Sequence, residues 1–238
     1  KKYIAVFVYA VVVFLLTGCS SQNNRKMETS LFSISWNASS IGSWKYAIKP
    51  AGKTIELKLP VFEIDGKQTS TLLNSLEEVG QPVTLSNGVT EYIYEGTFQS
   101  DTTLRLQVKF RVAADNPVVR FCYTLKTSGG QKLTRESGKD DLTYLSYSMK
   151  DFSEVKEINL SVFNEMIHSC NLGETPVFDA DFANSGSVVG PILLGNDKQT
   201  TFLCAYEHDS MYPDNYLKFG FQPDKTVGLH AVKGNYYA

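Results

Sequence analysis

The stretch that decides the fold class is Leu-Arg-Leu-Gln-Val-Lys-Phe-Arg-Val, residues 104–112. Apolar side chains stand at every second position: Leu104, Leu106, Val108, Phe110 and Val112. Successive side chains of a β-strand point to opposite faces, so one face of this segment is buried and the other is solvated. That pattern is typical of an antiparallel sheet with one covered face. We therefore predict a strand whose five apolar side chains lie in the core.

Similar short runs recur along the whole chain. Residues 55–61 alternate in the same way, and Pro60 within them favours an edge strand. The other candidate strands are Phe32–Trp36, Trp44–Ile48, Glu91–Phe98, Val118–Leu125, Leu142–Met149, Ile158–Phe163, Pro191–Leu194, Thr200–Tyr206, Tyr216–Phe221 and Val227–Val232. So many short strands predict an all-β protein built as one large antiparallel β-sandwich.

Turn signals separate these runs, and little of the sequence favours helix. The turn signals are Asp65-Gly66, Asn87-Gly88, Asp115-Asn116-Pro117, Ser128-Gly129-Gly130 and Gly195-Asn196-Asp197. Asn87-Gly88 predicts a two-residue hairpin, because both residues accept positive φ. The best helical candidate is Ser70–Val79, which Gly80 would end. We expect very little helix and a single domain over residues 31–238.

The first 19 residues predict where the protein is found. Two lysines precede an apolar run from Tyr3 to Leu16, which is shorter than the roughly 20 residues needed to span a bilayer. This pattern predicts a secretory signal peptide over residues 1–18. The following Leu-Thr-Gly-Cys resembles the bacterial lipobox, which implies a lipid on Cys19. The alternative is an uncleaved anchor with an ordinary cysteine.

A polar segment separates this signal from the first predicted strand. Residues 19–30 lack any apolar period, so we expect a flexible tether there. The predicted location is the bacterial cell envelope, where the lipid holds the protein on a membrane, either in the periplasm or exposed at the surface. The sequence does not indicate which membrane leaflet carries the lipid.

Composition and cysteine count exclude several classes. The chain is 42% hydrophobic and 12% aromatic, which is enough for a sizeable core and excludes a disordered protein. Its 23 basic and 25 acidic residues are balanced, so nothing points to nucleic acid. Besides Cys19, an odd number of cysteines remains: Cys122, Cys170 and Cys204. One disulfide stays open as an alternative, but we expect Cys122 and Cys204 to be small buried hydrophobes.

Motifs for metal, cofactor or nucleophilic chemistry are weak in this sequence. Glu165 and His168 have the Glu-x-x-His spacing of bundle metal sites, but those sites need the motif twice, on helices. Neither a glycine-rich phosphate loop nor a Gly-x-Ser-x-Gly elbow occurs. We predict no metal, cofactor or catalytic residue. The stripe Arg105, Lys109 and Arg111 is interpreted as a solvated face paired with neighbouring acids; the alternative is a grip on an anionic glycan.

Residues 207–215 contain the strongest candidate for a binding site. Glu207, His208 and Asp209 follow the apolar run 202–205, and they can converge only if the chain leaves the sheet at Tyr206. Pro213 and the surrounding polar residues predict that it does. Such a loop suits a neutral sugar, bound by hydrogen bonds and by stacking on a tyrosine. The candidate binding residues are Glu207, His208, Asp209 and Tyr212. The alternative is a polar surface loop without a binding role.

Five segments occur in an order that resembles one known family. They are Asn87–Tyr92, Asn116–Phe121, Gly190–Leu193, Ala205–His208 and Ala231–Tyr237. Together they resemble the amino-terminal β-sandwich of family 36 glycoside hydrolases, the α-galactosidases (melibiases), over about residues 31–238. The resemblance implies a supersandwich of the galactose-mutarotase-like type. It supports the Tyr206-Glu207-His208 part of the candidate site, whereas residues 210–212 depart from the family.

In that family a (β/α)8 barrel follows the sandwich and supplies two catalytic aspartates of a retaining mechanism. No β/α alternation occurs here, so no catalytic residue is carried over, and we expect a fragment of a longer chain. The resemblance implies the non-catalytic domain of an envelope-anchored α-galactosidase, with α-galactoside oligosaccharides or glycans and its own barrel as partners. The candidate loop would then face that barrel.

Two alternatives stay open beside this reading. The first is a stand-alone glycan-binding surface lipoprotein without catalysis, and the second is a structural or adhesive surface lipoprotein. The sequence is compatible with a homo-oligomer.

Overall fold

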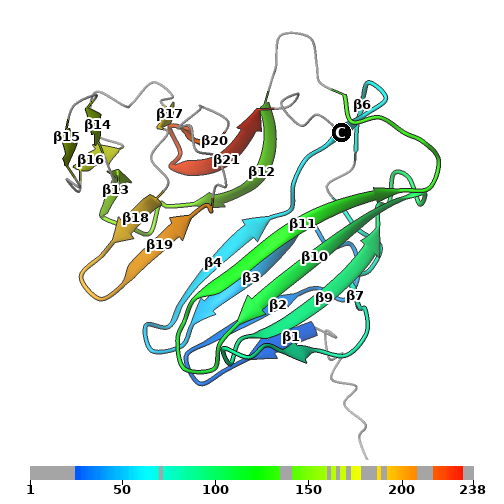
Figure 1. Ribbon diagram of the computed structural model, residues 1–238, viewed down its shortest axis with the longest axis horizontal. Coiled ribbons are helices and arrows are strands. Elements are labelled where there is room, and N and C mark those ends of the chain that lie inside the picture. Colours follow the sequence, from blue (N-terminus) through cyan, green and yellow to red (C-terminus); the bar gives the residue numbers. More distant parts are fainter. Residues whose placement is uncertain are drawn as a thin grey trace, which may run out of the picture.

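The computed structural model describes residues 25–69, 72–134, 141–159, 162–164, 167–169, 173–177, 187–188, 192–207 and 217–232. These residues form strands and turns without a helix, and every strand pair among them is antiparallel, so the predicted all-β sandwich is confirmed (Figure 1). Cys19, His208, Asp209 and Tyr212 lie outside the described residues.

The largest sheet runs through the whole molecule and has eight strands. In spatial order they are β1 (Arg25–Glu28), β2 (Phe32–Trp36), β3 (Ser43–Ile48), β4 (Lys53–Lys58), β12 (Asp141–Ser148), β21 (Thr226–Val232), β20 (Leu217–Phe221) and β17 (Ser187–Val188). Its middle is formed where β4 meets β12 at the pair Lys58 and Ser146. The sheet therefore joins the amino-terminal and carboxy-terminal parts of the described chain.

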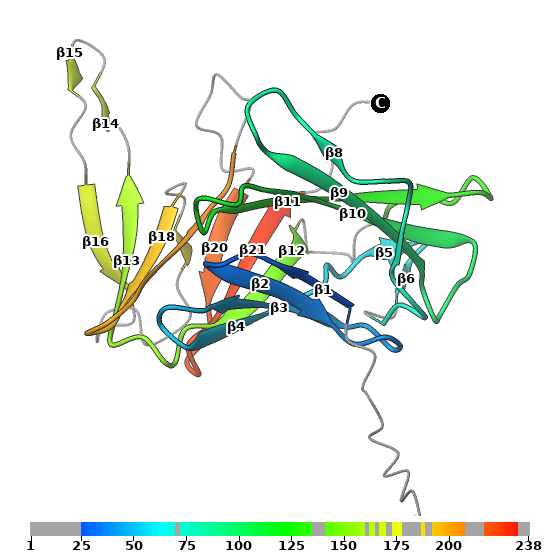
Figure 2. The same ribbon diagram turned by 90° about the horizontal axis from the view of Figure 1, so that it is seen from below.

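Two smaller sheets pack against different halves of the large one (Figures 1 and 2). The five-stranded sheet contains β11 (Val119–Thr127), β10 (Leu104–Val112), β9 (Thr90–Thr97), β7 (Glu77–Glu78) and β8 (Val83–Thr84). The four-stranded sheet contains β16 (Gly173–Val177), β13 (Glu154–Asn159), β18 (Ile192–Asn196) and β19 (Thr201–Ala205). Two short hairpins complete the described strands: β5 (Glu63–Ile64) with β6 (Lys67–Gln68), and β14 (Val162–Asn164) with β15 (Ile167–Ser169).

An aromatic cluster fills the space between the five-stranded sheet and β2–β4. Phe110 of β10 is 0% exposed, and its ring lies 5.2 Å from that of Trp44 and 6.3 Å from that of Trp36. The other predicted core residues of this strand are also buried: Leu104, Leu106, Val108 and Val112. The prediction from the alternation is confirmed. Burial of these apolar side chains is the main term that stabilises such a core.

The other half of the core lies between β12 and the four-stranded sheet. Phe202 of β19 packs edge-on against Tyr147 of β12 at 5.7 Å and stacks with Phe152 at 5.9 Å. Cys204, two residues further along β19, is buried there as predicted, whereas Cys122 on β11 is exposed, so the prediction for Cys122 was wrong. The cause is register: Cys122 pairs with Lys109, which lies on the solvated face of β10.

Three local predictions differ from the structure. Part of the predicted tether is a strand, because Arg25–Glu28 pairs with β2 and buries Met27. Residues 72–79 contain no helix and include β7, since Leu73 bonds to the backbone of Ile41 and Val79 to that of Ile93 on β9. Pro60 does not mark an edge: β4 ends at Lys58 and pairs with strands on both sides.

The two-residue hairpin lies at a different turn from the one predicted. Asp65 and Gly66 join β5 to β6, and both have positive φ, 48° and 76°. At Asn87-Gly88 only the glycine has positive φ, 80°, and the amide of Leu85 bonds to the carbonyl of Val89. This is a three-residue loop whose last residue is a left-handed glycine. Of the predicted strand Ile158–Phe163, the structure describes the two ends, which lie in β13 and β14, and residues 160–161 lie outside the described residues.

Candidate functional site

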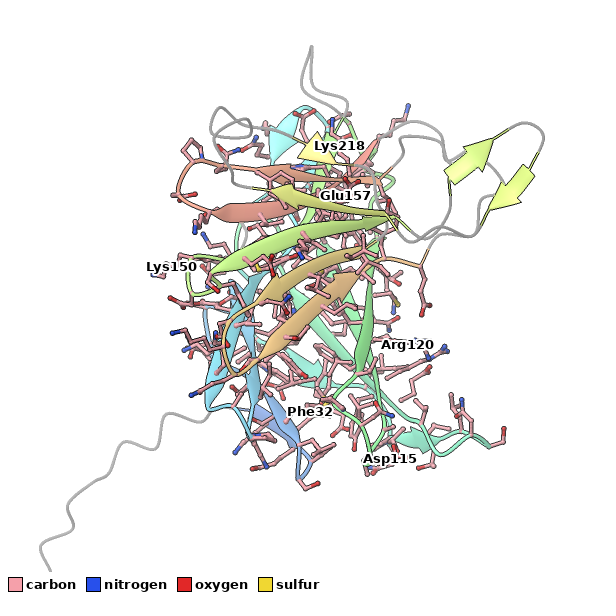
Figure 3. All side chains as sticks on the ribbon, turned by 90° about the vertical axis from the view of Figure 1, so that its left-hand side faces the viewer. Phe32, Asp115, Arg120, Lys150, Glu157 and Lys218 are labelled. Carbon is pink, nitrogen blue, oxygen red and sulfur yellow. The ribbon has the colours of Figure 1, made fainter. Side chains whose placement is uncertain are left out.

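One ion pair connects the two smaller sheets at the surface. Nε of Arg120, on β11, lies 2.7 Å from Oε1 of Glu207, which follows β19. Both side chains are exposed, 62% for Arg120 and 79% for Glu207, and Figure 3 shows Arg120 pointing away from the ribbon. Among the residues in the predicted site, Glu207 is the one that the structure describes. It therefore lies on an open surface, held by a cation that the sequence analysis did not include.

Aromatic side chains on the inner face of β11 are only partly buried. Phe121 and Tyr123 of β11 lie 5.5 Å apart, and Tyr144 of β12 lies 5.0 Å from Tyr123. Tyr206 precedes Glu207 and is also partly buried. We call Arg120, Phe121, Tyr123, Tyr144, Tyr206 and Glu207 the junction surface. Here the aromatic core reaches solvent, between the edge strands β11 and β19.

A β-bulge directs Tyr144 toward the free edge of β11. The pairing of β12 with β21 shifts between Thr143 and Leu145, so Tyr144 is the extra residue. The backbone amide of Tyr123 donates to the Tyr144 hydroxyl at 3.1 Å, and Nε1 of Trp44 donates to the Tyr123 hydroxyl at 2.9 Å. Burial raises the pKa of Tyr123 although the Trp44 bond opposes this, so the phenol stays neutral. The Tyr144 hydroxyl thus occupies an edge amide that could otherwise pair with an added strand.

Tyr206 connects the junction surface to the eight-stranded sheet. Its hydroxyl donates to the carbonyl of Leu217 at 3.5 Å, and its ring lies 5.8 Å from that of Phe219. Burial raises the pKa of Tyr206, and the negative charge of Glu157 raises it further. Glu157 is 7% exposed, on β13 (Figure 3). A buried carboxylate therefore lies close behind the junction surface.

The outer face of the five-stranded sheet carries the basic stripe. Glu91 binds Nε of Arg111 at 2.8 Å and Nζ of Lys109 at 3.2 Å. Glu95 binds Lys126 at 2.6 Å and Arg105 at 3.2 Å in the same way. The hydrogen bond from Arg111 lowers the pKa of Glu91, and that from Lys126 lowers the pKa of Glu95. The interpretation of this stripe as a solvated face paired with acids is confirmed.

The five segments of the resemblance meet through their described residues. Arg111 pairs across the sheet with Glu91 of the first segment and with Arg120 of the second. The ion pair joins Arg120 to Glu207 of the fourth segment, while Ala205 pairs with Ile192 of the third. The fifth is reached through Leu217, which accepts from Tyr206 and pairs with Ala231. These connections converge on the junction surface.

The remaining predicted site residues stay predictions. His208, Asp209 and Tyr212 lie outside the described residues, so their convergence with Glu207 is untested. The part of the chain that the structure describes contains no group of three His, Cys, Asp or Glu side chains that could hold a metal. Sequence reasoning missed Arg120 and Tyr144. Arg120 stands within a resembling segment, which was a usable signal, whereas no pattern marked the bulge at Tyr144.

Comparisons with models of known protein families, with curated proteins and with solved structures found no match to this chain. Within the described residues, the structure contains no helix long and apolar enough to cross a membrane.

Proposed function

We propose that this chain is the non-catalytic amino-terminal sandwich of an envelope-anchored α-galactosidase. In the full-length protein a (β/α)8 barrel would hydrolyse terminal α-galactosides with retention, as the resemblance implies. The junction surface would contribute contacts to the glycan or to the barrel. Glu207 is the first candidate for such a contact, with His208, Asp209 and Tyr212 on the same loop.

The observation that carries the proposal is the convergence of the five segments. They were identified by their order in the sequence, without regard to their positions in space. Yet strand pairing and two side-chain contacts join them around Arg120, Tyr206 and Glu207. Residues shared with a family for structural reasons alone would be spread through the core. Ligand sites form preferentially where domains meet, and the segments Asn116–Phe121 and Ala205–His208 reach the edge strands β11 and β19.

The second candidate function is a stand-alone glycan-binding lipoprotein without catalysis. The partly exposed rings of Phe121, Tyr144 and Tyr206 favour it, since sugars bind through stacking and a few well-placed polar groups. Both candidates place the protein on a membrane through a lipid on Cys19. On that reading Cys19→Ala moves the protein from the membrane fraction to the soluble fraction, because two or more acyl chains anchor firmly.

The test is hydrolysis of p-nitrophenyl α-galactoside by the full-length protein and by this chain alone. We expect turnover from the full-length protein and none from the chain. In the full-length protein, Glu207→Gln should lower kcat/KM roughly ten- to hundredfold, the effect of a lost charged hydrogen bond. Glu154→Gln is the matched control, since Glu154 is an exposed glutamate paired with one lysine at the far end of β13.

The outcomes separate the two candidates. A full-length protein that binds α-galactosides without turnover supports the binding lipoprotein. Hydrolysis with unchanged kinetics in Glu207→Gln would remove Glu207 from the site. A full-length protein that neither binds nor hydrolyses α-galactosides would overturn both proposals.

A further inference from the structure

We propose that Arg120, which lies next to Arg111 on the outer face, binds the uronate carboxylate of an acidic glycan, and that Glu207 takes the place of that carboxylate here as a built-in counter-anion. The inference rests on the glycan-binding role proposed above. It adds to the proposed α-galactosides those glycans that also carry a carboxylate.

Strand register places the two arginines next to each other, and each guanidinium is held by a different carboxylate: Arg111 by Glu91 of β9 and Arg120 by Glu207 beyond the edge of β11. Arg111 of β10 and Arg120 of β11 are direct cross-strand partners, and both side chains are exposed on the outer face. Side chains at such positions start about 4.5–5.5 Å apart at their Cβ atoms. Like charges directly opposite one another destabilise a sheet, so a pair of this kind needs an anion beside it.

The two anions that serve this pair are held very differently. Glu91 is 15% exposed in its side chain and bridges Arg111 and Lys109, so it is a fixed part of the sheet. Glu207 is 79% exposed and reaches Arg120 from outside the sheet, at the end of β19. Exposed single ion pairs contribute little to stability. The carboxylate of Glu207 can therefore be exchanged for that of a ligand at small cost.

The charge of the surrounding face favours an anionic ligand. Facing outward on β9, β10 and β11 are five cations and two carboxylates: Arg105, Lys109, Arg111, Arg120 and Lys126 against Glu91 and Glu95. The whole chain has a formal net charge of −2, so this face is opposite in sign to the protein. A local field of this kind steers anions to the surface.

Guanidinium chemistry suits a carboxylate within that class. The planar group of arginine presents parallel donors that match both oxygens of a carboxylate. Glu207 makes one such contact, with its Oε1 atom 2.7 Å from Nε of Arg120.

The test measures binding of tri-galacturonate to the chain by calorimetry, at about 0.01 M and about 1 M salt. At low salt we expect Arg120→Gln to weaken binding about tenfold or more. Glu207→Gln should tighten it severalfold, because the carboxylate that competes with tri-galacturonate is gone; a neutral α-galactoside has no carboxylate to displace Glu207, which then stays in place as a contact. Arg105→Gln and Glu154→Gln are the controls and should leave affinity within about twofold. High salt should weaken the wild-type interaction strongly. Circular dichroism shows that each variant is folded.

Opposite effects of the two partners of one ion pair are the decisive result. A structural ion pair would change affinity in the same direction in both variants, and that result would overturn the proposal, as would equal losses in Arg120→Gln and Arg105→Gln. Binding of a neutral α-galactoside without any binding of tri-galacturonate would overturn this inference alone. Binding of neither ligand would overturn the proposed glycan-binding role as well.

Discussion

The outer face of the five-stranded sheet and the junction surface are both charged, but they hold their charges differently. On the sheet, Glu91 and Glu95 each bridge two cations and are largely covered by them. At the junction surface, Arg120 and Glu207 form one exposed pair between two sheets. Shared, half-buried pairs form a network that supports the fold, whereas a single exposed pair contributes little. The junction surface is therefore free to serve binding.

The two regions also differ in how their aromatic rings are buried. Phe110 lies under the five-stranded sheet and is enclosed by Trp36, Trp44 and Tyr94. Phe121 is its neighbour at the junction surface, yet it remains partly exposed. An exposed ring at an edge gains less from burial than an enclosed one. A partly exposed Phe121 suits a surface that contacts a ligand or another domain.

The largest effect should come from truncating these two rings. We expect Phe110→Ala to lower the free energy of unfolding by about 3–5 kcal/mol, because it opens a cavity in the aromatic cluster. Phe121→Ala should cost about half as much or less, since solvent already reaches the ring. Urea denaturation measures both values. Equal losses would show that Phe121 is as much a core residue as Phe110, and would weaken the case for the junction surface.

The edge of β11 provides a smaller test. Tyr144→Phe removes the hydroxyl that accepts from the amide of Tyr123, so we expect a loss of about 1–2 kcal/mol in unfolding free energy. Tyr206→Phe is the matched comparison, because its bond to Leu217 is 3.5 Å long and therefore weaker. Hydrogen exchange at Tyr123 should accelerate in the first variant. An unchanged rate would mean that the bulge does not protect this edge.

Acid should act on the outer face through Glu91 and Glu95. The pKa of both carboxyls is lowered in the folded state from the ordinary value of 4.5, so they stabilise the fold above that pH. Their contribution is lost as pH falls through the folded pKa. Below pH 4.5 the unfolding free energy of the double variant Glu91→Gln/Glu95→Gln should fall less than that of the wild type, by on the order of 1 kcal/mol in total. Gln107→Ala, on the same face, should keep the wild-type dependence of the melting temperature on pH. A double variant with that same pH dependence would contradict a stabilising role for the ion pairs of Glu91 and Glu95.

The sequence predicted most of the fold because the relevant signals are local. Alternation over residues 104–112 determines which face is buried, and the strand positions followed within a few residues. The misplaced hairpin shows the limit: Asp65-Gly66 and Asn87-Gly88 are alike as dipeptides, and the flanking pairing decides which turn each one forms. Exposure of Cys122 likewise follows from its register with Lys109, which its apolar neighbours do not reveal.

The candidate site was harder to predict, because it depends on how separate sheets meet. Glu207 was identified from residue types and from the resemblance, but its partner Arg120 comes from another sheet. The bulge at Tyr144 leaves no periodic signal in the sequence. Contacts between sheets depend on packing rather than on local patterns, so the junction surface emerges only when β11, β12 and β19 are placed together.

The most direct test of the junction surface is hydrogen exchange of the chain with and without a saturating α-galactoside oligosaccharide. We predict slower exchange over residues 119–123 and 204–207, and unchanged exchange over residues 90–97 and 104–111. Protection confined to the outer face of the five-stranded sheet, or protection at neither region despite measured binding, would contradict the assignment of the binding role to the junction surface.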